Sequence, residues 1–350
     1  MTGTLRLLLA MIVAGVHFRP NYLTINVIGS ATLVTFFVIS GYAMTGLFSS
    51  RFAGRPTGVR RFYLDRILRI APQYYFWMLV AIAIITVSRH SSGWHAFAFF
   101  QTGHPTWFNM LCNLSIFPVG FWPYFPSLAT FQLVPPAWSL TIELAFYLLL
   151  PAILGRKWVL YTVTALSLAA FCMATQGIVD PVMYAYRVLP APLLYVVIGH
   201  AMFARKYRLL IGIYAVLLVD FVVLILRHKL GMGFNPGVLL GVSLGAVLMR
   251  LSVAMRSWRF DDLAGRVSYG CYLAHWPLLT VIHPQDQHPW LGIPFALGAV
   301  LLGWISYRLV DLRILGWRRR LAGMKMPGTT GTGMGLSQQQ AGSDGAAELR

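Results

Sequence analysis

Ionisable side chains inside apolar segments are the residues of this sequence whose type and position could support chemistry. His17 is the second-last residue of the apolar stretch RLLLAMIVAGVHF, and Glu143 lies inside PAWSLTIELAFYLLLP at residues 136–151. A polar group at membrane depth is costly unless it is paired, so each one is a functional candidate. A histidine can act as a general base, and a neighbouring carboxylate can fix its tautomer and raise its basicity. We therefore predict His17 and Glu143 as catalytic partners; a structural pairing of Glu143 with an Arg or Trp is the alternative.

Arg6 shares its helix face with His17. The two are eleven positions apart, which is about three helical turns and about 16 Å along the axis. Taken alone, Arg6 could be a topological anchor that snorkels to the headgroups, and His17 could be a helix-end histidine wetted from outside. The shared face favours a joint role in one passage through the membrane.

A second basic feature stands at RRFYLDRILRIAP, residues 60–72. Arg66 and Arg69 are three positions apart, on one face where an apolar segment begins. Ordinary cytoplasmic charge explains some of these arginines, but the facing pair would also suit a phosphate clamp. We predict Arg66 and Arg69, together with Arg6, as ligand-binding cations on the cytoplasmic side.

Weaker polar points complete the candidate site. Four residues are expected to contact a substrate: Ser40, Trp138, Tyr147 and His275. For Ser40 and His275, simple packing is the alternative. The three cysteines lie far apart, show no ligand spacing and are predicted to be packing residues. No metal is predicted.

Composition indicates what must position these side chains. The chain has 350 residues, of which 57% are hydrophobic and only 11% charged, and this excludes a soluble globular domain. The net charge of +18 does not indicate nucleic acid, because Lys and Arg cluster between apolar segments. The apolar segments approach the roughly 20 residues that a membrane-spanning helix needs and are too continuous for barrel strands. We predict an all-α integral membrane protein.

Ten helices are expected, and the distribution of basic residues orients them. The predicted spans are about 4–19, 25–48, 70–88, 137–154, 158–176, 186–204, 209–226, 236–254, 267–284 and 292–311. With the N-terminus placed in the cytoplasm, 22 of the 28 Lys and Arg fall on the inner side and five on the outer side. The positive-inside rule therefore predicts both termini inside.

Three segments have separate expectations. The first apolar stretch lacks a convincing cleavage site and is predicted to be a retained helix. The connection 89–136, rich in Trp, Phe and Pro, is expected to lie at the interface or to re-enter, with an apolar piece at 107–117 too short to span. Residues 1–320 are expected to form one transmembrane domain, and residues 321–350 a disordered cytoplasmic tail.

Four motifs together resemble the membrane acyltransferase-3 family. They are Arg6 with ten residues to His17, the FFVISGY and FYLDRILRIAP stretches at 36–42 and 62–72, PAWSLTIELAFYLLLP, and VSYGCYLAHWPL at 267–278. The resemblance covers most of the chain up to about residue 311. It implies that His17 is the family's essential histidine and Glu143 its carboxylate. One departure is Val34, where many relatives carry an aspartate, so no catalytic carboxylate is assigned to the second helix.

The resemblance implies a membrane-embedded O-acyltransferase of the bacterial cytoplasmic membrane. It would move an acyl group, in the first place acetyl, from cytoplasmic acyl-CoA to a saccharide hydroxyl; the motifs look most like the short exopolysaccharide-modifying branch. A small glycosylated metabolite is an alternative acceptor. The competing classes are a saccharide or lipid-carrier transporter or flippase, and a structural subunit of an export assembly. Expected partners are acyl-CoA, acceptor and lipid, with a second copy or polysaccharide-synthesis machinery as further candidates, and no nucleic acid.

Overall fold

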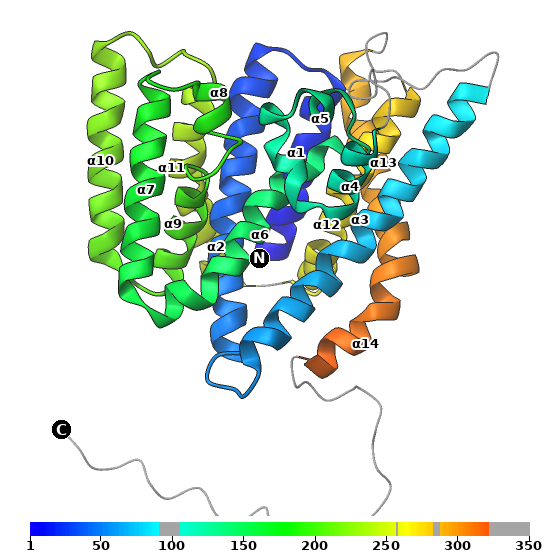
Figure 1. The fold of residues 1–350 in the computed structure, drawn as a ribbon, viewed down its shortest axis with the longest axis horizontal. Helices are drawn as coiled ribbons and strands as arrows, with labels where there is room; N and C mark the ends of the chain where they lie inside the picture. Colours follow the sequence, from blue (N-terminus) through cyan, green and yellow to red (C-terminus); the bar gives the residue numbers. More distant parts are fainter. Residues whose placement is uncertain (91–105, 257, 283–287, 322–350) are drawn as a thin grey trace, which may run out of the picture.

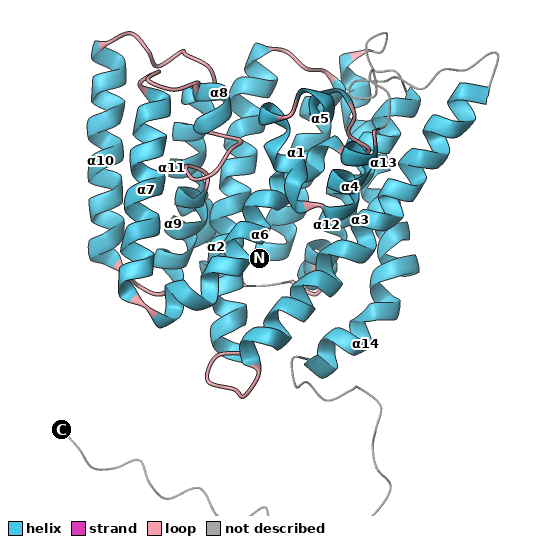
Figure 2. Cartoon of the chain, viewed as in Figure 1, coloured by secondary structure: helices cyan, strands magenta, loops and turns pink. Residues whose placement is uncertain are grey.

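A computed structural model describes residues 1–90, 106–256, 258–282 and 288–321 of the chain. Over these residues the chain consists of helices and connecting loops, without a strand (Figure 2). The longer helices are α1 (Thr2–Phe18), α2 (Ser30–Arg51), α3 (Gly58–His90), α6 (Trp138–Gly155), α7 (Lys157–Thr175), α9 (Leu193–Phe203), α10 (Tyr207–Leu226), α11 (Asn235–Ala254), α12 (Asp261–Ile282), α13 (Gly292–Ser306) and α14 (Leu312–Leu321). The predicted all-α class is confirmed.

Seven helical segments of the described chain are long and apolar enough to cross a bilayer. They are Leu23–Arg51, Gly58–Ser88, Pro135–Gly155, Lys157–Thr175, Tyr207–Leu226, Asn235–Ala254 and Gly292–Leu321. The shorter apolar helices α1 and α9, and α12 with two aspartates in its first turn, account for the other three predicted segments. The chain is therefore a multi-pass membrane protein.

Three boundaries differ from the predictions. Helix α3 begins at Gly58 rather than near 70, α9 begins at Leu193 rather than near 186, and α13 continues through Tyr307–Asp311 into α14 rather than ending near 311. The first turns of α3 and all of α14 are rich in arginine. Apolar content alone does not detect such segments, because their helical hydrogen bonds do not depend on hydropathy.

The basic joints gather at one end of the helices. The loop between α2 and α3, the joint between α6 and α7, and α14 all lie at the lower end in Figure 1. These segments carry Arg55, Arg156 and the four arginines of α14, all of which the positive-inside rule assigns to the cytoplasm. The arrangement agrees with that assignment, and the orientation itself stays a prediction. The tail predicted to be disordered lies outside the described residues, apart from its first residue.

The aromatic connection forms a cap over the outer half of α6. Its described part contains α4 (Trp107–Ser115), a 3-10 helix over Phe117–Tyr124, α5 (Pro126–Thr130) and a short turn over Pro135–Ala137. Thr141 of α6 holds the cap: its Oγ accepts the Gly120 N–H at 2.9 Å and donates to the Phe117 carbonyl at 2.7 Å. The apolar piece at 107–117, predicted to be too short to span, contains the nine-residue helix α4, and its place at the interface stays a prediction. Residues 91–105 lie outside the described part.

Small residues bring α1 against α12 and α13. Ala10 and Ala14 of α1 pack with Cys271 of α12 and Ala299 of α13 in one buried cluster. Small side chains let helix backbones approach closely, which is the usual basis of helix association within membranes. This packing decides which polar groups of α1 and α12 meet.

Helices α2 and α9 make a close backbone contact that bears on the site. A Cβ atom on Gly41 would lie 2.0 Å from the Val196 carbonyl oxygen, and one on Gly199 would lie 1.9 Å from the Val38 carbonyl oxygen. Ser40, beside Gly41, donates a hydrogen bond to Glu143 of α6. The contact thus fixes the helix that supports the buried carboxylate.

Replacing these glycines should therefore loosen the bundle. Gly41→Ala and Gly199→Ala are each expected to destabilise the purified protein by roughly 1–3 kcal/mol, the usual cost of overpacking a tight contact. The measurement is the thermal unfolding midpoint in detergent. Gly212→Ala is the matched control, because a Cβ there meets nothing within 4 Å. An unchanged midpoint for Gly199→Ala would contradict the close approach of α2 and α9.

Candidate functional site

Three cavities follow one another through the helix bundle. An outer cavity of about 240 Å³ contains His17, a middle cavity of about 50 Å³ contains Glu143, and an inner cavity of about 630 Å³ contains Arg318. The outer and middle cavities share Leu33 and Tyr272 in their walls. The middle and inner cavities share four wall residues, Arg6, Met44, Arg66 and Arg69. The three cavities are therefore neighbours in a series, with the smallest in the middle, and we call this series the passage.

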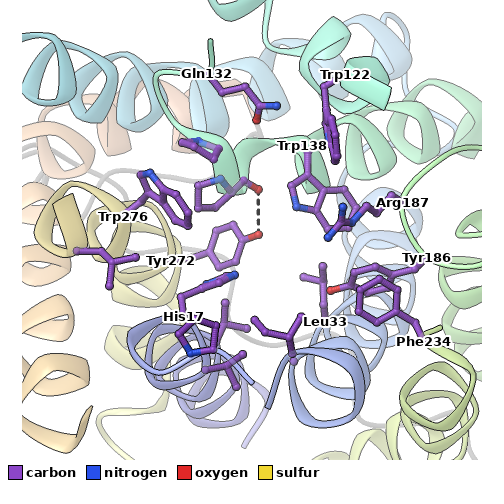
Figure 3. A pocket seen from close by; sticks show the side chains of 18 residues that line it. His17, Leu33, Trp122, Gln132, Trp138, Tyr186, Arg187, Phe234, Tyr272 and Trp276 are labelled. Carbon is purple, nitrogen blue, oxygen red and sulfur yellow. Dashed lines mark hydrogen bonds between the residues drawn. The ribbon is translucent and has the colours of Figure 1, made fainter. Parts of the chain in front are cut away.

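His17, in the wall of the outer cavity, forms a stacked pair with His275 (Figure 3 labels His17). His275, predicted as a substrate contact, is fully buried and is not among the residues that line this cavity. The two histidine rings are nearly parallel, with centroids 5.1 Å apart, and Nδ1 of His17 lies 3.1 Å from Nε2 of His275. The edge of Trp276 packs against the His17 ring, with centroids 5.6 Å apart. Tyr272, Trp276 and His17 line the same wall of the cavity (Figure 3). Helix α12 therefore supplies the second histidine beside the one on α1.

The backbone determines the tautomers of this pair. Nδ1 of His275 lies 2.6 Å from the Tyr272 carbonyl oxygen, which can only accept, so this nitrogen carries the proton. In a neutral imidazole Nε2 of His275 is then an acceptor, and Nδ1 of His17 must donate to it. Nε2 of His17 is left with the free electron pair. The arrangement assigns the basic nitrogen of His17, as a general base requires.

Glu143 does not pair with His17. Its carboxylate accepts hydrogen bonds from Ser40 Oγ at 2.6 Å and from the Tyr147 hydroxyl at 3.3 Å. Glu143 lines the middle cavity, whereas His17 lines the outer one. The predicted His17–Glu143 pair is therefore corrected: Glu143 faces α2, and His275 takes the expected place beside His17. Ser40 is fully buried and supports Glu143 instead of lining one of these three cavities.

The predicted arginine pair lines the passage, but both members have carboxylate partners. Arg66 pairs with Asp65, which also accepts from Arg318 at 3.0 Å. Arg69 pairs with Asp311 at 3.0 Å. The facing pair is thus part of a network that joins α3 to α14. Each arginine still borders both the middle and the inner cavity.

Arg6 differs from these two. Its guanidinium lies over the Phe36 ring at 5.2 Å, and its Nε is buried without a hydrogen-bond partner among the described residues. Arg6 lines the middle and inner cavities, and the charges of Arg6 and Glu143 are near enough to interact. An arginine in this state can take an anionic ligand without first breaking an ion pair.

The outer cavity is walled by aromatic side chains and contains an arginine that the sequence analysis did not select. Trp138 lines it, as expected for a substrate contact, together with Trp122 from the cap and Phe234 (Figure 3). Arg187, in the connection before α9, lies among these rings. In the sequence Arg187 was one of five basic residues on the outer side, and no local signal separated it from the others.

The comparisons agree with this architecture. A family model described as an acyltransferase domain, that of the acyltransferase-3 family, matches residues 4–308. The chain belongs to the acyltransferase-3 family. It is 32% identical over 190 residues to an uncharacterised protein of Aquifex aeolicus, covering 51% of this chain and 85% of that protein.

A second relative has a named activity. The chain is 23% identical over 324 residues to the peptidoglycan O-acetyltransferase OatA of Listeria monocytogenes, covering 80% of this chain and 50% of the relative. The chain thus spans about half the length of that protein. No solved structure matches the chain. The resemblance inferred from the four motifs is confirmed at the level of the family, and the roles of individual residues stay predictions.

The histidine pair leads to a test of how His17 is oriented. His275→Phe removes the acceptor for His17 Nδ1 while filling the space, so the basic nitrogen is no longer fixed. We expect kcat for acyl transfer to fall at least about tenfold, because the hydrogen-bond partners that orient histidine ligands of metals typically contribute about 10- to 100-fold. The dissociation constant for acyl-CoA should not change.

A double variant distinguishes a loss of His17 orientation from a general loss of structure caused by His275→Phe. In a His17→Ala background, His275→Phe should cause little further loss, because residues that act as a unit are not additive. An independent, multiplicative loss would show that His275 does not work through His17.

Proposed function

We propose that this protein is an O-acyltransferase of the bacterial cytoplasmic membrane. It would move an acyl group, in the first place acetyl, from cytoplasmic acyl-CoA to a hydroxyl of a saccharide acceptor, such as an exopolysaccharide or its lipid-linked precursor. The observation that carries the proposal is the passage that joins an arginine-lined cavity at one end to His17 at the other. The family supports acyl transfer, and the Listeria relative, named for peptidoglycan, supports a saccharide acceptor.

The inner cavity suits the phosphates of the donor. Seven arginines and three aspartates line it, which leaves an excess of positive charge after pairing: Arg6, Arg51, Arg66, Arg69, Arg266, Arg318 and Arg319 against Asp65, Asp261 and Asp262. Guanidinium groups bind phosphate through paired, charge-assisted hydrogen bonds. The cavity is also the largest of the three, as a nucleotide requires.

The narrow middle cavity suits the thin arm that carries the thioester. Arg6 and His17 lie eleven residues apart on α1, about 16 Å along the axis. An extended pantetheine arm is of comparable length. The nucleotide could therefore remain in the inner cavity while the acyl carbon reaches His17. In this scheme Glu143 balances the charge of Arg6 along the passage, and Tyr147 and Ser40 hold Glu143.

The reaction that fits is direct general-base transfer. Nε2 of His17 takes the proton of the acceptor hydroxyl as its oxygen forms a bond to the thioester carbonyl carbon. The tetrahedral adduct then collapses, the carbon–sulfur bond breaks, and the CoA thiolate receives the proton from His17. A covalent acyl-histidine is the alternative route, in which Nε2 itself forms the first bond to carbon.

Labelled acetyl-CoA provides the central test. Purified protein is incubated with acetyl-CoA labelled in its acetyl group and with a bacterial exopolysaccharide fraction, and esterified label is measured. We expect transfer by the unchanged protein and a loss of about 10²- to 10⁴-fold in His17→Ala. His90→Ala, an exposed histidine at the end of α3, is the control. Full activity of His17→Ala would refute the proposal. Label retained on His17 of the unchanged protein would indicate the covalent acyl-histidine route.

Donor binding provides a second test, which does not depend on an acceptor. Arg6→Gln, and separately the double change of Arg66 and Arg69 to Gln, should weaken acetyl-CoA binding at least about tenfold, because each removes charge-assisted hydrogen bonds worth roughly 1.5–3 kcal/mol. Isothermal titration with the purified protein measures the change. Arg60→Gln, an exposed arginine of α3 outside these cavities, is the control. An unchanged dissociation constant in both variants would exclude the arginines from the donor site.

A further inference from the structure

Arg187 stands in the outer cavity inside a cage of aromatic rings. Its guanidinium carbon lies 5.4 Å from the ring centre of Trp122, 5.9 Å from that of Trp138 and 5.5 Å from that of Phe234. These rings come from three different segments: the cap, the start of α6 and the residue before α11. Tyr186 completes the wall (Figure 3). The fold thus brings separate elements together around one cation.

Among the described residues, the cage supplies no hydrogen-bond acceptor to the Nε of Arg187. Its Nε is buried and has no hydrogen-bond partner, and no ion pair joins the guanidinium to a carboxylate of the described chain. Asp180, whose charge acts on Arg187, uses its own carboxylate to accept the Met183 N–H at 2.9 Å. Ring faces attract a cation but accept its N–H groups only weakly, so the planar fork of donors remains open to a ligand.

Arg187 and His17 line opposite walls of the same cavity. In Figure 3 the Arg187 side chain lies beside Trp138 and Tyr186, and His17 lies across the cavity beside Tyr272. A molecule that fills the cavity would contact both. One end of it would present a hydroxyl to the base, and the other would meet the partly buried guanidinium of Arg187.

We propose that Arg187 binds an anionic group of the acceptor, a carboxylate or a phosphate attached to the sugar that is acylated. The inference rests on the proposed function, because it takes the outer cavity as the acceptor site. A planar guanidinium matches both oxyanions through two parallel hydrogen bonds. The aromatic walls suit the apolar faces of a sugar ring. The site therefore selects an acidic saccharide over a neutral one.

The first experiment measures binding alone, so that it does not depend on turnover. Three short oligosaccharides are compared: one that ends in glucose, one that ends in glucuronic acid and one that carries a glucose phosphate. Trp122 and Trp138 flank Arg187, so ligand binding should change the tryptophan fluorescence of the purified protein. We expect the two acidic sugars to bind at least tenfold more tightly than the neutral one. Equal affinity for all three would overturn the proposal.

Variants of Arg187 then test whether this side chain causes the preference for acidic sugars. Arg187→Gln should remove the preference for acidic sugars, and Arg187→Lys should keep part of it, because an ammonium retains the charge without the planar fork. Arg227→Gln changes an exposed arginine of the same outer end and should leave the preference intact. Arg187→Gln that still prefers acidic sugars would rule out Arg187. The comparison of sugars on the unchanged protein holds even where a variant fails to fold.

The same ligands keep this inference separate from the proposed function. Binding that depends on Arg187, without any transfer of label from acetyl-CoA, would refute acyl transfer to these sugars and uphold the anion site. Transfer to neutral and acidic sugars at the same kcat/KM would uphold the proposed function and refute the anion site. Higher kcat/KM for one acidic sugar, lost in Arg187→Gln, would identify whether the group is a carboxylate or a phosphate.

Discussion

Charge buried among apolar helices is the constraint on which the rest of this structure depends. Ionised groups away from water are tolerated only when they are paired or hydrogen-bonded. Asp65 meets this demand between Arg66 and Arg318, and Asp311 meets it with Arg69. These pairs tie α3 to α14 at the arginine-rich end. Arg6 and Arg187 depart from the rule, since each has a buried Nε without a hydrogen-bond partner in the described chain. They lie at different depths along the passage, where an anionic ligand would accept the hydrogen bonds that each guanidinium lacks.

The same constraint explains why the passage has a polar lining although the helices are apolar. Glu143 lies between Ser40 and Tyr147, so a carboxylate can stay at depth without a direct ion pair. The two histidines solve a similar problem by hydrogen bonding to each other and to the Tyr272 carbonyl oxygen. In each case the partners come from a neighbouring helix or from an adjacent turn of the same helix. Packing between helices, rather than the local sequence, decides which polar groups become functional.

The difference between local sequence and packing between helices also separates what could be predicted from the sequence from what could not. Hydropathy predicted all ten helical segments, because the bilayer imposes its length on each helix independently. It misplaced the start of α3, where arginines in the first turns mask a continuous helix. The pairing of His17 with His275 depends on the small residues that join α1 to α12, and no spacing within one helix reveals it. Arg187 was indistinguishable from other outer arginines until the cap and α11 placed aromatic rings around it.

The sizes of the three cavities bear on how a donor and an acceptor could meet across a membrane. The middle cavity, about 50 Å³, is far smaller than the inner cavity of about 630 Å³ or the outer cavity of about 240 Å³. A nucleotide or a sugar ring would not pass through it, whereas a thin chain could lie within it. In the proposed reaction the two bulky substrates therefore stay at opposite ends, and only the acyl group moves from one side to the other. The narrow point then seals the membrane while His17, beyond it, still reaches the thioester.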